Sequence, residues 1–362
     1  MSWTLARQDL LDLAYGAALL GSGGGGDPYI GRLMVERAMD QGRTVTVLGL
    51  DEVPDDGLVI STAMMGAPTV MIEKLPAGTE GGRALQALED HLGEKAVAII
   101  PMECGGLNSM LPLVVAAEAG IPVIDADGMG RAFPELQMET FHVFGVSGSP
   151  LAIANEHGDV TVVIARDNWA MEWLARGICV RMGGAAMIAE YSMYGAVAKN
   201  VSIPGTLGLG IEIGRAARQA RREHGDLLEN LGGALASISY RGPRLLFEGK
   251  VEDVFRETTG GFVKGRTQIR AHGTNQVLKV AFQNENLIAE LDGEILAVVP
   301  DLICVLAAET AEPITTEGLR YGQRVQVISI TPPEIMRSTA ALEVFGPRAF
   351  GFDVDYEPSC GA

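Results

Sequence analysis

The chain has 362 residues, of which 47% are hydrophobic and 20% charged, and its formal net charge is −18. A chain of this length is usually too long for a single hydrophobic core, so two domains are expected. The acidic net charge disfavours nucleic acid as a binding partner, because contacts to its phosphates need clustered lysine and arginine. No apolar run reaches the length of a membrane span and the N-terminus lacks an uninterrupted apolar segment, so we expect a cytoplasmic protein without membrane contacts.

The first half of the chain alternates apolar strands with helices. Residues 5–20 have helical spacing, and Asp27-Pro28 is typical of the start of a second helix. Further along, strands are expected at 44–50, 58–63, 96–100 and 121–124, with intervening helices at 83–92 and 110–119. This alternation favours a mostly parallel sheet with flanking helices.

The pattern then changes toward strands without intervening helices. Strands are expected at 140–146, 151–154 and 160–164, and helices at 168–180 and 211–222. Beyond residue 245, short strands broken by Gly, Asn and Pro are expected at 245–251, 261–271, 277–282, 287–291, 294–299 and 323–330. We therefore predict an α/β protein with an N-terminal α/β domain (8–170) and a C-terminal α+β domain (171–358). The second domain is expected to be a small antiparallel barrel or sandwich.

A run of four glycines lies between the first two predicted helices. Glycine is costly to order unless the backbone turns tightly or approaches a ligand closely. Gly21, Gly23 and Gly26 formally match a dinucleotide-binding motif, but that motif follows a strand and here a helix precedes it. A structural turn and a ligand-binding loop both remain open. As a ligand loop, the segment would offer backbone N–H groups from Gly23, Gly24, Gly25, Gly26 and Asp27.

Two polar clusters directly follow predicted strands of the sheet. Strand 96–100 leads into Glu103, Cys104, Gly105, Gly106 and Asn108, and strand 121–124 leads into Asp125 and Asp127. Ligands of open α/β sheets bind beyond the carboxyl ends of the strands, so both clusters are expected at one rim. Cys104 fits a nucleophile, a soft metal ligand or a small core residue.

The carboxylates and one histidine also allow more than one interpretation. Asp125 and Asp127 fit cation ligands, a general base or turn caps. His142 is predicted to begin a strand, and it fits a metal ligand, a proton carrier or a structural residue.

These motifs resemble those of the S-methyl thiohydantoin desulfurase family, whose members often occur beside hydantoinase/oxoprolinase-type proteins. The resemblance covers nearly the whole chain and implies two family domains that divide near residue 170. The stretches that carry it are GSGGGGDP (21–28), ECGGLN (103–108), PVIDADGMGR (122–131), SIPGT (202–206) and GPRAFG (346–351).

The resemblance implies a hydrolase that desulfurises a thiohydantoin-type five-membered ring, releases sulfide or methanethiol and leaves a hydantoin. It further implies a divalent metal, expected to be zinc. In this hypothesis the metal ligands are Cys104, Asp125 and His142, and the catalytic residues are Glu103, Cys104 and Asp127. The glycine loop, Gly105, Gly106 and Asn108 would bind the substrate, in the manner of an oxyanion hole.

Two other functions stay open at this point. The first is a metal-free hydrolase or isomerase that acts on hydantoin-like or lactam substrates with Cys104 as nucleophile. The second is a non-catalytic partner subunit of a hydantoinase/oxoprolinase-type enzyme. In either case a homo-oligomer is expected.

Overall fold

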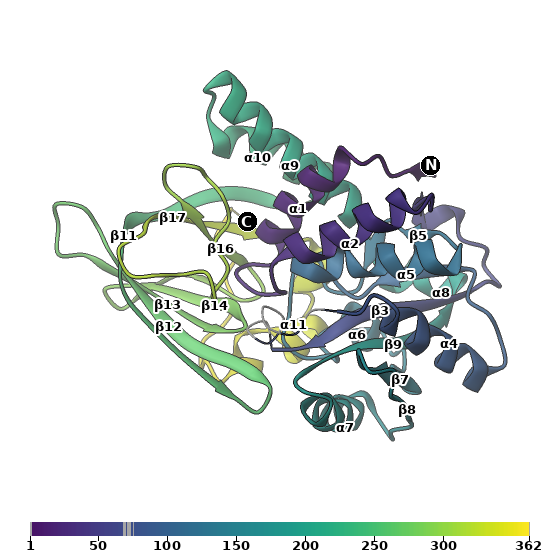
Figure 1. Ribbon diagram of the computed structural model, residues 1–362. Coiled ribbons are helices and arrows are strands. Elements are labelled where there is room, and N and C mark those ends of the chain that lie inside the picture. The colour runs from purple at the N-terminus through teal and green to yellow at the C-terminus, as the bar shows by residue number, and fades with distance from the viewer. Residues whose placement is uncertain (1, 68–69, 71–73, 75, 362) are drawn as a thin grey trace.

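An eight-stranded sheet, sheet A, forms the core of the larger part of the molecule (Figure 1). The structure is a computed structural model that describes residues 2–67, 70, 74 and 76–361. In spatial order the strands of sheet A are β1 (Trp3–Thr4), β2 (Thr46–Leu48), β5 (Val123–Ile124), β4 (Ala98–Pro101), β3 (Leu58–Gly66), β9 (Ala185–Tyr194), β7 (Leu151–Ala154) and β8 (Val160–Val163). Strands β2, β5, β4 and β3 run parallel, and the flanking strands pair antiparallel.

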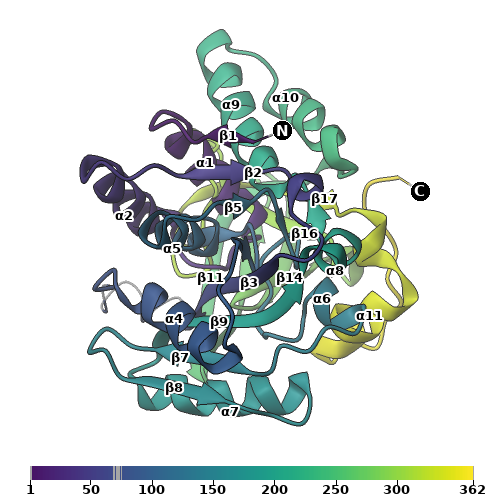
Figure 2. The ribbon, with the colours of Figure 1, turned by 90° about the vertical axis from the view of Figure 1, so that its right-hand side faces the viewer.

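Helices cover both faces of sheet A, as the alternation of strands and helices predicts (Figure 2). One face carries α2 (Pro28–Asp40), α4 (Glu80–Leu92) and α5 (Leu111–Ala119), and the other carries α6 (Thr140–Val143), α7 (Asn168–Arg181), α8 (Gly195–Val201) and α11 (Thr339–Phe345). Successive strand residues point to opposite faces, so Val59 packs in one core and Ile60 in the other. Both faces of the central strands are therefore buried away from solvent.

Three further helices pack together beside the sheet. Helix α1 (Asp9–Leu20) packs against α9 (Thr206–Glu223), and α10 (Leu227–Leu235) packs against α9 in turn. Gly16 and Gly214 permit this close approach, because a Cβ on either would lie about 2 Å from a backbone oxygen of the facing helix. Asp27 caps α2 by accepting a hydrogen bond from the Tyr29 N–H at 2.9 Å, which confirms the predicted start of that helix.

The second sheet, sheet C, is antiparallel throughout and curls into a half-barrel (Figure 1). Contacts between β14 and β16 draw its two ends toward each other. Its strands in spatial order are β15 (Glu294–Val298), β14 (Glu285–Leu291), β13 (Val277–Gln283), β12 (Phe262–Arg270), β11 (Arg241–Thr259), β17 (Arg324–Thr331) and β16 (Leu302–Ala307). The predicted α/β class with a C-terminal antiparallel region is confirmed.

One predicted element is wrong, and several were not predicted. Residues 140–143 form helix α6 and not a strand, because Thr140 bonds through both its N–H and its Oγ1 to the Gly128 carbonyl, and Phe141 is buried beside it. Strand β9 has the small side chains of a buried central strand, which show no alternation. It pairs with β3 and β7, so sheet A draws strands from both sides of residue 170. Strand β16 and helix α10 were also not predicted.

A two-stranded ribbon, β6 (Ala126–Asp127) with β10 (Ile203–Pro204), links the 122–131 and 202–206 motifs. Within the described ranges no helix combines the length and the apolar character that crossing a bilayer requires.

Candidate functional site

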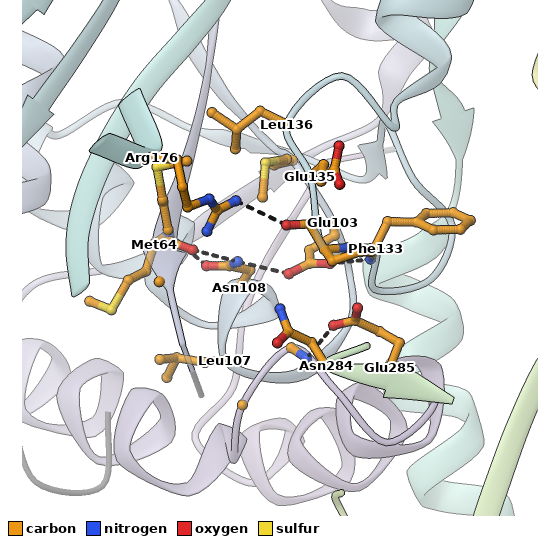
Figure 3. Close-up of a pocket in the computed structure, with 16 residues that line it drawn as sticks. Met64, Glu103, Leu107, Asn108, Phe133, Glu135, Leu136, Arg176, Asn284 and Glu285 are labelled. Atoms are coloured by element: carbon orange, nitrogen blue, oxygen red, sulfur yellow. Dashed lines mark hydrogen bonds between the residues drawn. The ribbon is translucent and has the colours of Figure 1, made fainter. Parts of the chain in front are cut away.

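A polar hollow lies between the strand-end loops of sheet A and the rim of sheet C (Figure 3). It encloses about 530 Å³, including space open to solvent. The end of β3 and the loop that follows β4 supply one wall, as expected for the carboxyl ends of parallel strands. Its lining residues are Gly25, Gly26, Met64, Met65, Gly66, Met102, Glu103, Leu107, Asn108, Phe133, Pro134, Glu135, Leu136, Arg176, Asn284 and Glu285. We call this feature the hollow.

Glu103 is fixed on the sheet A side of the hollow by a short hydrogen-bond network (Figure 3). The Asn108 amide donates to Glu103 Oε1 at 2.8 Å and to the Met64 carbonyl at 3.1 Å, while Asn108 Oδ1 accepts from the Met64 N–H at 2.7 Å. Burial and the nearby charge of Glu285 raise the pKa of Glu103 well above its usual range, against hydrogen bonds from Asn108 and Phe133. Burial therefore favours the protonated form of Glu103.

Glu285 enters the hollow from sheet C, at the start of β14. Its Oε1 accepts from the Gly25 N–H at 3.1 Å, and its buried Oε2 has no hydrogen-bond partner among the described residues. Burial raises the pKa of Glu285 to about 8, although Arg131 and the Gly25 N–H oppose the shift. Two carboxyl groups with separately tuned pKa values that face one small space are suited to acid–base chemistry.

The glycine run joins three segments of the fold. The Ser22 and Gly23 carbonyls accept from Asn286 and Thr316 of the sheet C region at 2.8 and 2.7 Å, and the Gly25 carbonyl accepts from Leu107 at 2.8 Å. Of the predicted loop, Gly25 and Gly26 line the hollow, while Asp27 caps α2. The run therefore both turns the chain and borders the candidate site.

The other predicted glycines serve close packing beneath the hollow. A Cβ on Gly23 would lie 2.5 Å from the Asn286 amide nitrogen, and one on Gly24 would lie 2.1 Å from Glu285 Oε1. Gly105 packs against Ala132, and a Cβ on Gly106 would lie 2.4 Å from the Gly25 backbone. These positions hold the backbone that carries the lining residues, and they do not line the hollow themselves.

We expect Gly24→Ala to lower the kcat of any reaction that depends on Glu285, because the new methyl group displaces the Glu285 carboxylate. Secondary structure should change little. A 1 Å misplacement of a catalytic group costs about a hundredfold in rate. Steady-state turnover together with circular dichroism measures both effects. Gly233→Ala in α10 is the matched control, because a Cβ there meets no atom within 4 Å, and equal activity of the two variants would contradict the role of Gly24.

Cys104 lies beneath the hollow and does not line it. Its Sγ accepts from Thr206 Oγ1 at 3.2 Å, and its N–H donates to Asp127 Oδ2 at 2.6 Å. Asp127 also accepts from the Gly130 N–H at 3.1 Å, so this carboxylate anchors two turns. Burial raises the pKa of Cys104 well above its usual range and that of Asp127 to about 7. The thiol is thus protonated and shielded.

The three predicted metal ligands do not assemble into a site. Asp125 Oδ1 accepts from the Gly208 N–H at 2.9 Å near the start of α9. His142 Nδ1 lies 2.9 Å from the Asn168 amide, and its ring meets Trp169 edge-on. Among the residues that the structure describes, no three His, Cys, Asp or Glu side chains are grouped to hold a metal ion. The zinc cofactor stays a prediction.

The cysteine environments predict a reactivity order for the native protein. Cys360 is half-buried, whereas Cys104, Cys179 and Cys304 are buried, and burial raises the pKa of Cys179 to about 11 and of Cys304 to about 12. Since the thiolate is the reactive form, we expect alkylation of the folded protein to label Cys360 first. Peptide mass mapping after brief iodoacetamide treatment checks this, with denatured protein as the control. Labelling of Cys104 as fast as Cys360 would contradict the buried thiol.

Sequence reasoning found Glu103, Asn108, Gly25 and Gly26 but missed the residues that face them. Asn284 lies between β13 and β14, Glu285 is the first residue of β14, and Arg176 lies on α7. The available signal was the polar stretch Gln283-Asn-Glu-Asn286 between apolar strands.

The fold and the hollow define a two-part α/β protein whose small polar site lies between a parallel-centred sheet and an antiparallel half-barrel. The chain belongs to the S-Me-THD-like family: the model of its N-terminal domain matches residues 8–165, and that of its C-terminal domain matches residues 165–359. The resemblance to the S-methyl thiohydantoin desulfurase family is thereby confirmed. The two domain models meet at residue 165.

The fold also occurs in a solved structure. The chain is similar to a protein from Chromobacterium violaceum determined by X-ray crystallography, with a TM-score of 0.80 and 24% sequence identity over 99% of this chain and 100% of the other. No match was found among the curated proteins.

Proposed function

We propose that the protein catalyses the hydrolytic desulfurisation of a thiohydantoin-type five-membered ring. The observation that carries this proposal is the pair Glu103 and Glu285, two buried carboxyl groups that face one small polar hollow from opposite sheets. Family membership supports the substrate class. The side chain of Asn284, which lines the hollow, supplies a neutral polar group suited to the carbonyl and N–H groups of such a ring.

Glu285 is assigned the general base. In the carboxylate form it takes a proton from water through Oε2, and the water oxygen forms a bond to the ring carbon that bears sulfur. The π bond between this carbon and the ring nitrogen breaks at the same time, and its electron pair moves to the nitrogen. The resulting tetrahedral species carries both oxygen and sulfur on that carbon, and its ring is held between the lining groups of the hollow.

Glu103 is assigned the general acid. It gives its proton to the departing sulfur as the carbon–sulfur bond breaks, and the hydroxyl proton passes to the ring nitrogen, so the ring carbon becomes a carbonyl and methanethiol leaves. With an unmethylated thione the π bond that breaks on attack is the carbon–sulfur one, and the sulfur takes both the Glu103 proton and the hydroxyl proton and leaves as hydrogen sulfide. One water is consumed, and transfer of the proton from Glu285 back to Glu103 restores the starting state. The overall reaction is therefore proton-neutral.

Isotope-labelled water tests the reaction directly. We expect the purified protein to convert an S-methyl thiohydantoin to hydantoin with one labelled oxygen on the former sulfur-bearing carbon and one equivalent of methanethiol. Mass spectrometry of the product and a colorimetric thiol assay measure the two quantities. Label in a ring-opened acid without release of sulfur would contradict desulfurisation, and would instead indicate hydrolysis of a ring amide.

A further inference from the structure

A second pair of acidic side chains, Glu139 and Glu190, lies apart from the lining of the hollow. Both residues have 0% exposure, and none of their four carboxylate oxygens has a hydrogen-bond partner among the described residues. An ionised carboxylate buried without a partner is strongly unfavourable, so this pair needs a proton or a cation. The charge of Arg176 acts on Glu190, but its guanidinium donates to Glu172 Oε1 at 2.6 Å and to the Pro134 carbonyl at 3.0 Å and not to Glu190.

A third side chain with an unpartnered oxygen, Ser61, lies opposite Glu190. Ser61 of β3 stands directly opposite Glu190 of β9 in the antiparallel register, and paired residues of neighbouring strands project to the same face with Cβ atoms about 5 Å apart. Ser61 has 0% exposure, and its Oγ has no hydrogen-bond partner in the described part of the chain. Ser61 and Glu190 therefore present three oxygen atoms on one face of sheet A.

The backbone at this place is irregular. The β3–β9 register shifts between Val59 and Ser61, and Tyr191, next to Glu190, has a φ of 43°. A non-glycine residue in the left-handed region of a bulged strand is costly and is often associated with a functional site.

Glu139 completes the cluster from the loop before α6. Gly128 approaches it so closely that a Cβ there would lie 2.4 Å from Glu139 Oε2. Burial and then the charge of Glu190 raise the pKa of Glu139 well above its usual range, so the two carboxyl groups are electrostatic neighbours. Tyr191 experiences the charges of both Glu139 and Glu190 as well.

We propose that Glu139, Glu190 and Ser61 bind one hard divalent cation, of the class of Ca²⁺ or Mn²⁺, in a buried site behind the hollow. The set offers four carboxylate oxygens and one hydroxyl oxygen, without sulfur or imidazole, which is the donor set that hard cations prefer. The two negative charges of the pair balance a divalent ion. The site is distinct from Cys104, Asp125 and His142, it lies outside the lining of the hollow, and its test does not depend on the proposed reaction.

Elemental analysis and thermal unfolding of the full chain test this site without any activity measurement. We expect about one divalent cation per chain after dialysis, and loss of it in Glu190→Gln and Glu139→Gln. After treatment with a chelator, Ca²⁺ or Mn²⁺ at a hundredfold excess over its Kd is expected to raise the Tm of the wild type by about 4 °C and to leave Glu190→Gln unchanged. Binding also competes with protons, so the shift should grow as pH rises.

Two further variants keep the test decisive. Ser61→Ala removes only the hydroxyl and is expected to weaken cation binding, which gives a readout if the glutamine variants do not fold. Glu89→Gln is the matched control, because that buried carboxylate is already bonded to Lys95 at 2.8 Å and to the Ala96 N–H at 2.9 Å, and its cation content should equal that of the wild type. Wild-type protein with neither a stoichiometric cation nor a Tm response to Ca²⁺ or Mn²⁺ would overturn the proposal and assign the pair a shared proton.

Discussion

Replacement of Glu285 by glutamine is expected to lower kcat for desulfurisation by a factor of about 10² to 10⁴, which is the usual contribution of a general base. Glutamine preserves the shape of the side chain and can still accept from the Gly25 N–H, so the fold should be unaffected. Glu290→Gln, on the same strand but outside the lining of the hollow, is the matched control and should retain wild-type kcat. Initial rates of thiol release measure all three proteins.

The pH profile gives an independent check on the same residue. Since the pKa of Glu285 is about 8 and the base must be ionised, kcat/KM of the wild type should rise with pH as Glu285 ionises around pH 8, and it should fall where Glu103 loses its proton. This rise of kcat/KM with pH is expected to disappear in Glu285→Gln. A wild-type profile that falls through pH 8 would reverse the assignment and make Glu285 the general acid.

The largest expected effect on stability comes from Arg131. This side chain has 0% exposure, and its guanidinium donates to the carbonyls of Asp301 at 2.6 Å, Asn286 at 3.1 Å and Ala132 at 3.1 Å. Burial lowers the pKa of Arg131 to about 10, so it remains charged at neutral pH. Arg131→Met keeps most of the volume but leaves these buried carbonyls without a donor, which should cost about 3–5 kcal/mol in the free energy of unfolding.

Urea unfolding followed by circular dichroism measures this loss as a lower transition midpoint. Arg348→Met is the control, because Arg348 is exposed and pairs with Asp355 at the surface, where an ion pair contributes about 0–1 kcal/mol. Equal midpoints for the two variants would show that Arg131 does not join the 122–131 segment to sheet C.

The sequence allowed prediction of those features that local patterns determine. The strand–helix alternation predicted the parallel centre of sheet A, and the rule for strand ends placed Glu103 and Asn108 at the site. Strand β9 escaped prediction because a strand buried on both faces has no alternation, and 140–143 was misassigned because contacts with Gly128 override local propensity.

The remaining site residues depend on contacts that no local pattern contains. Glu285 reaches the hollow only because β14 docks beside the glycine run. Cys104 points away from the hollow because its Sγ accepts a hydrogen bond from Thr206 and its N–H donates one to Asp127. The direction in which a side chain projects from a turn depends on partners such as these, which are distant in the sequence. The zinc ion, the homo-oligomer and the hydantoinase/oxoprolinase-type partner stay predictions.

Glu103 and Glu285 belong to different sheets, and this separation constrains how the protein becomes active during folding. Neither sheet alone contains an acid and a base, so a chain with both sheets formed but not yet docked has native secondary structure and no catalytic pair. Contacts between residues so distant in sequence form late, because closing the long intervening loop costs entropy before any contact repays it. Recovery of turnover after dilution from denaturant should therefore lag behind recovery of the far-ultraviolet signal.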